Sequence, residues 1–168
     1  MTDTDKQGRA MGQAHLTSTN SYYEDFTIGD VMRHARGKTI GDLENVMITN
    51  MVMNTAAGHF DEHFMAQTPF GGRLSFGGVN LSVVVGLASQ DTSENALAEL
   101  RMDKLRLRNP VMHGDTLYAY SEVLGKTDGD DPSSGEVTFR HWGVNQNDKI
   151  VVEVERTVLI KKKAHWLP

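Results

Sequence analysis

The segment Gly77–Ser89 consists almost entirely of apolar and small residues. Its length suits a helix that is buried on all sides better than a strand. A valine triplet at 83–85 argues the other way, because β-branched residues favour strands. We expect a buried helix on which four small residues form a stripe that a sheet approaches closely: Gly78, Ser82, Gly86 and Ser89.

Four segments of alternating polarity follow this helix: Ala98–Arg108, Thr116–Leu124, Glu136–Gly143 and Ile150–Ile160. Alternation with a period of two is typical of strands with one dry and one wet face, as in antiparallel sheets. A helix that must be covered and a run of antiparallel strands can satisfy each other if the sheet curves around the helix. The sequence therefore predicts an α+β fold with a curved antiparallel sheet wrapped around one central helix.

The region before the buried helix divides into an extended piece at 31–38, a helix and a long loop. The sequence from Thr39 to Asp42 is a plausible capping box, and it opens a helix that we expect to continue to Asn54. Core packing is the favoured role for its methionines over lining an acyl pocket: Met47, Met51 and Met53. Gly58–Arg73 is long for a plain connector, which favours a functional loop.

Composition excludes several classes of protein. The chain has 168 residues, a net charge of −5 and no cysteine, so we expect one domain, no nucleic-acid partner, no disulfide and a cytoplasmic location. Residues 1–20 are polar and predict a flexible tail before a domain at 21–168. No stretch is apolar enough to predict a membrane partner.

Two motifs resemble those of the MaoC-like (R)-specific enoyl-CoA hydratases. The first is NTAAGHFDEHFMA at 54–66, followed by TPFGGRLSFGG at 68–78, and the second is NPVMHGDTL at 109–117. They are similar to the signature D-x-N-P-x-H-x-D, to the H-G that opens the central helix, and to the P-V-x-x-G-D-x-L turn. The resemblance covers most of residues 21–160.

This resemblance implies a hot-dog fold, a homodimer or larger homo-oligomer, and an acyl-CoA hydratase or dehydratase with no cofactor besides its CoA thioester substrate. It assigns proton transfer to His59 and the oxyanion-binding amide to Gly77, with Gly78 and Phe76 beside the substrate. Imidazole exchanges protons near neutral pH, and an N–H at a helix N-terminus can stabilise an enolate oxygen. These are the roles such a reaction needs.

The sequence departs from the family pattern where the catalytic Asp is expected, because position 54 is Asn. An amide is neither a general acid nor a general base at neutral pH. Three explanations stay open, in this order: Asn54 orients water while His59 alone moves protons; a nearby carboxylate, Asp61 or Glu62, substitutes; or the protein binds acyl-CoA without turnover. For Asp61 itself, capping a helix is the favoured role over catalysis.

An acyl-CoA thioesterase is the other alternative reaction, because some hot-dog enzymes place a carboxylate on the central helix. Residues 77–89 contain none, and Asp91 falls beyond the expected end of that helix. His59 and His63 have the spacing of zinc ligands, but no Glu occupies the position that a metalloprotease needs. We predict no metal site, and assign His63 and His113 structural or surface roles.

Overall fold

The computed structural model describes residues 21–167 and contains one five-stranded antiparallel sheet of order β1-β3-β4-β5-β2. The extended piece at 31–38 and the four expected strands are all present as strands, with some ends shifted or extended: β1 (Val31–Thr39), β2 (Ala96–Leu107), β3 (Thr116–Asp128), β4 (Ser134–Val144) and β5 (Ile150–Lys161). Short helices stand at the two ends: η1 (Tyr23–Asp25) and α5 (Lys163–Trp166). The expected tail at 1–20 lies outside the described residues.

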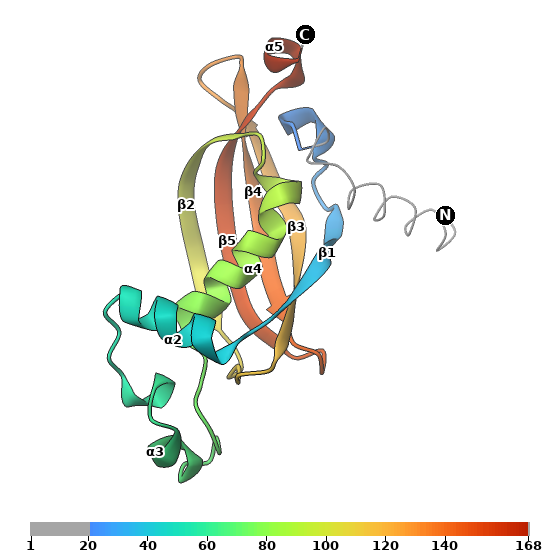
Figure 1. Ribbon diagram of the computed structural model, residues 1–168. Helices are drawn as coiled ribbons and strands as arrows, with labels where there is room; N and C mark the ends of the chain where they lie inside the picture. Colours follow the sequence, from blue (N-terminus) through green and yellow to red (C-terminus); the bar gives the residue numbers. More distant parts are fainter. Residues whose placement is uncertain (1–20, 168) are drawn as a thin grey trace.

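The central helix α4 (Gly77–Thr92) lies against the curved sheet (Figure 1). It runs three residues further than expected and so includes Asp91. The stripe of small residues does not face the sheet, because Ser82 and Gly86 are exposed. The close approach is made instead by a glycine on the sheet: a Cβ on Gly143 would overlap the fully buried side chain of Val84.

The helix α2 (Asp42–Met51) begins two residues later than the expected capping box implies and ends three residues before Asn54. Gly41 is its N-cap, and the Glu44 carboxylate accepts the Gly41 N–H at 3.0 Å. The Thr39 hydroxyl pairs with the hydroxyl of Thr116 in the adjacent strand. β1 continues through Thr39 and pairs with β3 there. Thr39 therefore belongs to the sheet and is not the helix cap that the sequence pattern predicted.

The methionine-bearing face of α2, which we expected to pack in the core, faces outward. Met47 and Met51 are exposed, as is Met53 beyond the helix, whereas Asn45 and Thr49 are fully buried. Apolar side chains also lie exposed along β2, which is an edge of the sheet. On α2 and β2 the apolar side chains with the highest exposed fractions are Leu43, Met47, Met51, Leu100, Met102, Leu105 and Leu107.

The long loop between α2 and α4 contains two short helices, η2 (Ala57–His59) and α3 (Glu62–Ala66). In Figure 1 it projects from the end of the sheet where α4 begins. Its return segment is tied to the loop before β3 by an isolated bridge between Leu74 and Met112. No helix in the described part of the chain is long and apolar enough to span a membrane.

Candidate active site

The first turn of α4 presents backbone N–H groups beside a cavity. Neither Gly77 nor Gly78 has an acceptor for its N–H within residues 21–167. Such groups and the helix dipole together favour a negative charge at a helix N-terminus. The cavity, of about 300 Å³, is lined by Gly77 and by residues that include Leu74, Asn80 and Val111. A Cβ at position 77 would overlap only the tip of Leu107, an exposed side chain that can turn away.

His59 lies next to this helix start, with one ring nitrogen held by the backbone. Its Nδ1 is 2.9 Å from the carbonyl oxygen of Leu74, so Nδ1 carries a proton and donates it. In the neutral ring the proton-accepting atom is then Nε2. Nε2 has no partner in the described part of the chain. The ring packs edge-on against Phe76 with centroids 5.6 Å apart, so His59, Phe76 and Gly77 form one group.

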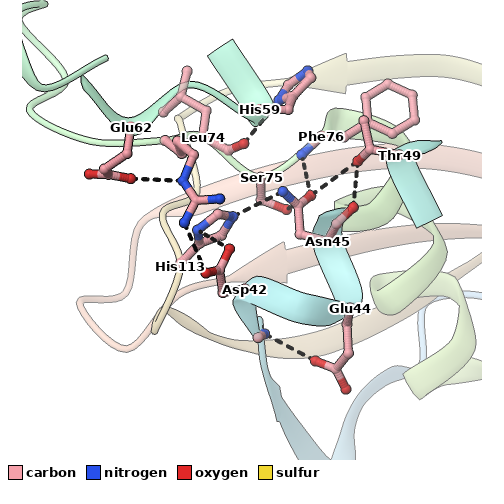
Figure 2. Close-up of polar contacts among 12 residues, drawn as sticks. Asp42, Glu44, Asn45, Thr49, His59, Glu62, Leu74, Ser75, Phe76 and His113 are labelled. Carbon is pink, nitrogen blue, oxygen red and sulfur yellow. Dashed lines mark hydrogen bonds and ion pairs between the residues drawn. The ribbon is translucent and has the colours of Figure 1, made fainter. Parts of the chain in front are cut away.

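The three residues that precede Gly77 are each tied down through their N–H groups. Leu74 donates to the Gly58 carbonyl and Ser75 to the Val111 carbonyl. The Phe76 N–H donates to the side-chain oxygen of Asn45 at 2.9 Å, a contact that Figure 2 shows reaching across from α2. The loop, the β2–β3 connection and α2 therefore all fix the segment that leads into α4.

Behind Asn45 a polar chain leads to the surface (Figure 2). The Asn45 amide nitrogen is 2.9 Å from His113 Nε2, and His113 Nδ1 is 3.4 Å from the Asp42 carboxylate. Asp42 also pairs with Arg73, whose second partner is Glu62, each at 2.8 Å. Both carboxylates raise the pKa of the Arg73 guanidinium, that of Glu62 most.

Sequence reasoning missed Asn45 entirely and gave His113 only a structural or surface role. His113 contacts Asn45, the residue that holds Phe76. The only sequence signal was the pair Asn45 and Thr49, two polar residues one turn apart on a helix whose other face is apolar. That signal does not say which face is buried.

The structure does not join Asn54 directly to His59. The Asn54 side-chain oxygen accepts the N–H of Ala56 at 3.1 Å, and no hydrogen bond links it to His59 within residues 21–167. Asp61 accepts the Phe64 N–H at 2.8 Å as the N-cap of α3, which is its favoured role. Asp61 caps a helix and Glu62 pairs with Arg73, so each of these carboxylates has a partner outside the His59 group.

Asp91 lies within α4, contrary to expectation, but it does not act at this site. It is fourteen residues beyond Gly77 on the same helix, which corresponds to about 21 Å at 1.5 Å per residue. Its carboxylate is bound to Nδ1 of the buried His34 at 2.6 Å. A thioesterase carboxylate acting on a thioester held at Gly77 is therefore absent from this helix.

Comparison with known proteins agrees with this geometry. The family model for mesaconyl-CoA hydratase matches residues 2–162. Among curated proteins, β-methylmalyl-CoA dehydratase from Chloroflexus aurantiacus is 35% identical over 113 residues, which are 67% of this chain and 32% of that protein. The chain spans less than half the length of the curated relatives that it matches.

Solved structures give the same result. A MaoC domain protein dehydratase from Chloroflexus aurantiacus superposes with a TM-score of 0.80 and 26% identity, over 87% of this chain and 46% of that one. A Mycobacterium tuberculosis protein with a double hot-dog fold superposes with a TM-score of 0.77 at 24% identity, over 88% of this chain and 46% of that chain. The chain has the hot-dog fold of MaoC-like proteins and belongs to the mesaconyl-CoA hydratase family.

Proposed function

We propose that the protein catalyses reversible addition of water to a 2-enoyl-CoA whose acyl group is branched and carries a second carboxylate, as in mesaconyl-CoA. In the reverse direction it dehydrates the matching 3-hydroxyacyl-CoA. The observation that carries the proposal is a free Gly77 N–H at the edge of a cavity, together with His59 at the same helix start, whose Nε2 has no hydrogen-bond partner among the described residues. The names of the family and of the dehydratase relative support the substrate class.

In this proposal the thioester oxygen is bound at the Gly77 N–H. Nε2 of His59 removes a proton from water as the water oxygen bonds to C3. The electron pair of the C2–C3 double bond moves onto the thioester as an enolate, and the helix N-terminus stabilises its negative oxygen. The imidazolium then returns the proton to C2, so that one water is added and His59 is neutral again.

Asn54 completes the proposal as a group that orients the attacking water. Its side-chain oxygen already accepts the Ala56 N–H, and its amide nitrogen keeps two N–H donors. A donor can hold the water through one oxygen lone pair while His59 takes the proton. This is the first of the three explanations for Asn54, and the engagement of Asp61 and Glu62 leaves the second without support.

We further propose that a second copy of the chain covers β2 and α2, in a homodimer or larger homo-oligomer. An edge strand with several exposed apolar side chains is a surface for pairing. The double hot-dog neighbour, which is about twice the matched length, supports a second module of the same kind. Light scattering on the native protein tests this, and a monomer at micromolar concentration would contradict it.

The proposed location is the cytoplasm, since a chain without cysteine suits a reducing compartment.

The test of the reaction follows enoyl-thioester absorbance with mesaconyl-CoA and with 2-methylbut-2-enoyl-CoA, in which a methyl group replaces the free carboxylate. We expect turnover by the native protein and a loss of about 10²- to 10⁴-fold in His59→Ala. A thiol reagent present in the same assay reports any release of free CoA.

Each alternative predicts a different outcome of this assay. A thioesterase would release thiol directly, with no earlier phase in which enoyl absorbance falls while the thioester stays intact. Binding without turnover, with activity appearing only in Asn54→Asp, would identify an acyl-CoA-binding protein. Either outcome rejects the proposed hydratase.

A further inference from the structure

The direction of the Gly77 N–H depends on how the preceding peptide is held. In a planar trans peptide the N–H of Gly77 points opposite to the C=O of Phe76. That carbonyl accepts the Asn80 N–H at 3.1 Å, and the Phe76 N–H donates to Asn45 at 2.9 Å. Both polar groups of Phe76 are therefore fixed, one by α4 itself and the other by α2.

The hydrogen-bond pattern determines the orientation of the Asn45 amide. Its oxygen must face the Phe76 N–H, since a reversed amide would place two donors against each other. The amide nitrogen then faces His113 Nε2, which has to be the acceptor. The proton of the neutral ring lies on Nδ1, on the side of the Asp42 carboxylate at 3.4 Å. The donors therefore run in one direction, from Phe76 to Asn45, from Asn45 to His113, and from His113 to Asp42.

This arrangement lies in a buried environment where loss of a partner has a cost. Asn45 is fully buried, and His113 is mostly buried. An unpaired polar group there destabilises its surroundings, so the local backbone shifts to find a new partner. A shift of the Ser75–Phe76 peptide displaces Phe76, and with it the start of α4 that directs the Gly77 N–H at the developing oxyanion.

We propose that Asn45 and His113 are positioning residues that aim the Gly77 N–H at the thioester oxygen. They touch no substrate and act through the Ser75–Phe76 peptide, whose N–H donates to Asn45 and which holds Phe76 immediately before Gly77. This inference rests on the proposed function, because it assigns a role to two residues in that same reaction. It predicts an effect on kcat, since an oxyanion contact strengthens in the transition state, with little effect on KM.

The first test compares Asn45→Ala with Asn45→Asp. Alanine removes the acceptor of the Phe76 N–H, and we expect kcat to fall about 30- to 100-fold with KM within about 3-fold. Aspartate keeps an oxygen at this place, and we expect kcat within about 5-fold of the native value. Thr92→Val is the matched control, because Thr92 is equally buried and donates to the Ala88 backbone carbonyl at 2.7 Å, at the other end of α4. Its kcat should not change.

The second test substitutes His113, and it can be carried out even if Asn45→Ala does not fold. His113→Leu removes the acceptor of the Asn45 amide, and kcat should fall about 10-fold by the same loss of alignment. His113→Gln supplies a carbonyl oxygen near the position of Nε2, so kcat should recover to within about 3-fold. Equal losses in the leucine and glutamine variants overturn the inference.

Hydrogen exchange at the Phe76 amide gives a readout that needs no substrate. Protection should fall in Asn45→Ala and His113→Leu, and persist in Thr92→Val. Loss of protection with unchanged kcat overturns the inference while leaving the hydratase intact. If the native protein hydrates no enoyl-CoA, the proposed function fails. Equal protection of Phe76 in Asn45→Ala and Thr92→Val then rejects the positioning role as well.

Discussion

The two ends of α4 each carry histidine and serine in hydrogen-bonded polar networks, but these side chains differ in their access to solvent. At the N-terminal end, His59 is partly exposed and Gly77 borders a cavity. At the C-terminal end, Asp91, His34 and Ser121 are linked by bonds of 2.6 and 2.7 Å, and His34 and Ser121 are almost completely buried. The order Asp, His, Ser is that of hydrolase triads. Access to solvent, and not residue type, separates the two ends.

The C-terminal network continues across the sheet. Ser121 Oγ lies 2.6 Å from His141 Nδ1, so one side chain from each of β1, β3 and β4 follows Asp91 in a row. If Asp91 accepts from His34 Nδ1, the Ser121 hydroxyl donates to His34 and accepts from His141. His141 Nε2 and Arg156 Nη1 are left buried without a partner in the described residues. Burial, and then the charges of Arg156 and His34, lower the pKa of His141 to about 3.

The largest expected difference is that a substitution at the N-terminal end of α4 lowers catalysis, whereas one at the C-terminal end lowers stability. His59→Ala should lower kcat by about 10²- to 10⁴-fold with little change in the free energy of unfolding. Ser121→Ala leaves the buried His34 Nε2 and His141 Nδ1 unpaired, so it should cost roughly 1–3 kcal/mol for each group while kcat of the folded protein stays near native. Urea unfolding and enoyl-CoA turnover measure the two quantities.

The matched control for the serine substitution is Ser82→Ala, on the exposed face of α4. It should change neither stability nor turnover appreciably. If Ser121→Ala removed turnover as completely as His59→Ala without unfolding the protein, the C-terminal network would belong to the reaction and the contrast between the two ends would be wrong.

The fold was predictable because its signals are local. Alternating polarity locates β2 to β5, and the apolar run locates α4, since each depends on which neighbours in sequence share a face. His59, Phe76 and Gly77 were also found from sequence, through motifs that lie within about twenty residues of one another. The structure brings all three together.

The remaining parts of the site depend on contacts that no local pattern contains. Asn45 meets Phe76 and His113 across 31 and 68 positions of the chain. The apolar side of α2 was expected to face the core, but Met47 and Met51 are exposed and polar residues point inward. Sequence periodicity identifies an amphipathic helix without saying whether its apolar face meets the chain's own core or a partner.

Acidification should affect the C-terminal network first. The folded-state pKa of His141, about 3, lies below its unfolded value of 6.5, so the unfolded chain binds the extra proton. The contribution is complete above pH 6.5 and is lost as the pH falls toward 3. Between pH 7 and 5 we expect a loss of about 2 kcal/mol in the free energy of unfolding.

This pH window separates His141 from the carboxylates. The Glu153 pKa is lowered from 4.5 by its hydrogen bonds to Arg140 and Arg108, so its contribution is lost only below that value. His141→Gln should therefore flatten the dependence between pH 7 and 5 even though it lowers stability overall. A slope that persists unchanged in the variant would show that another group titrates, and that the C-terminal end is not the acid-sensitive one.

The smallest expected effect concerns the N-terminal end of α4. It tests whether the Asp61 carboxylate takes part in the reaction there. Asp61 accepts the Phe64 N–H, a bond that a serine hydroxyl can also accept. Asp61→Ser should therefore keep both stability and kcat near native, and Asp61→Ala should cost about 1 kcal/mol by loss of the cap. Thermal unfolding and turnover of the two variants decide the matter. A large fall of kcat in Asp61→Ser at native stability would give the carboxylate a share in proton transfer, and His59 would no longer act alone.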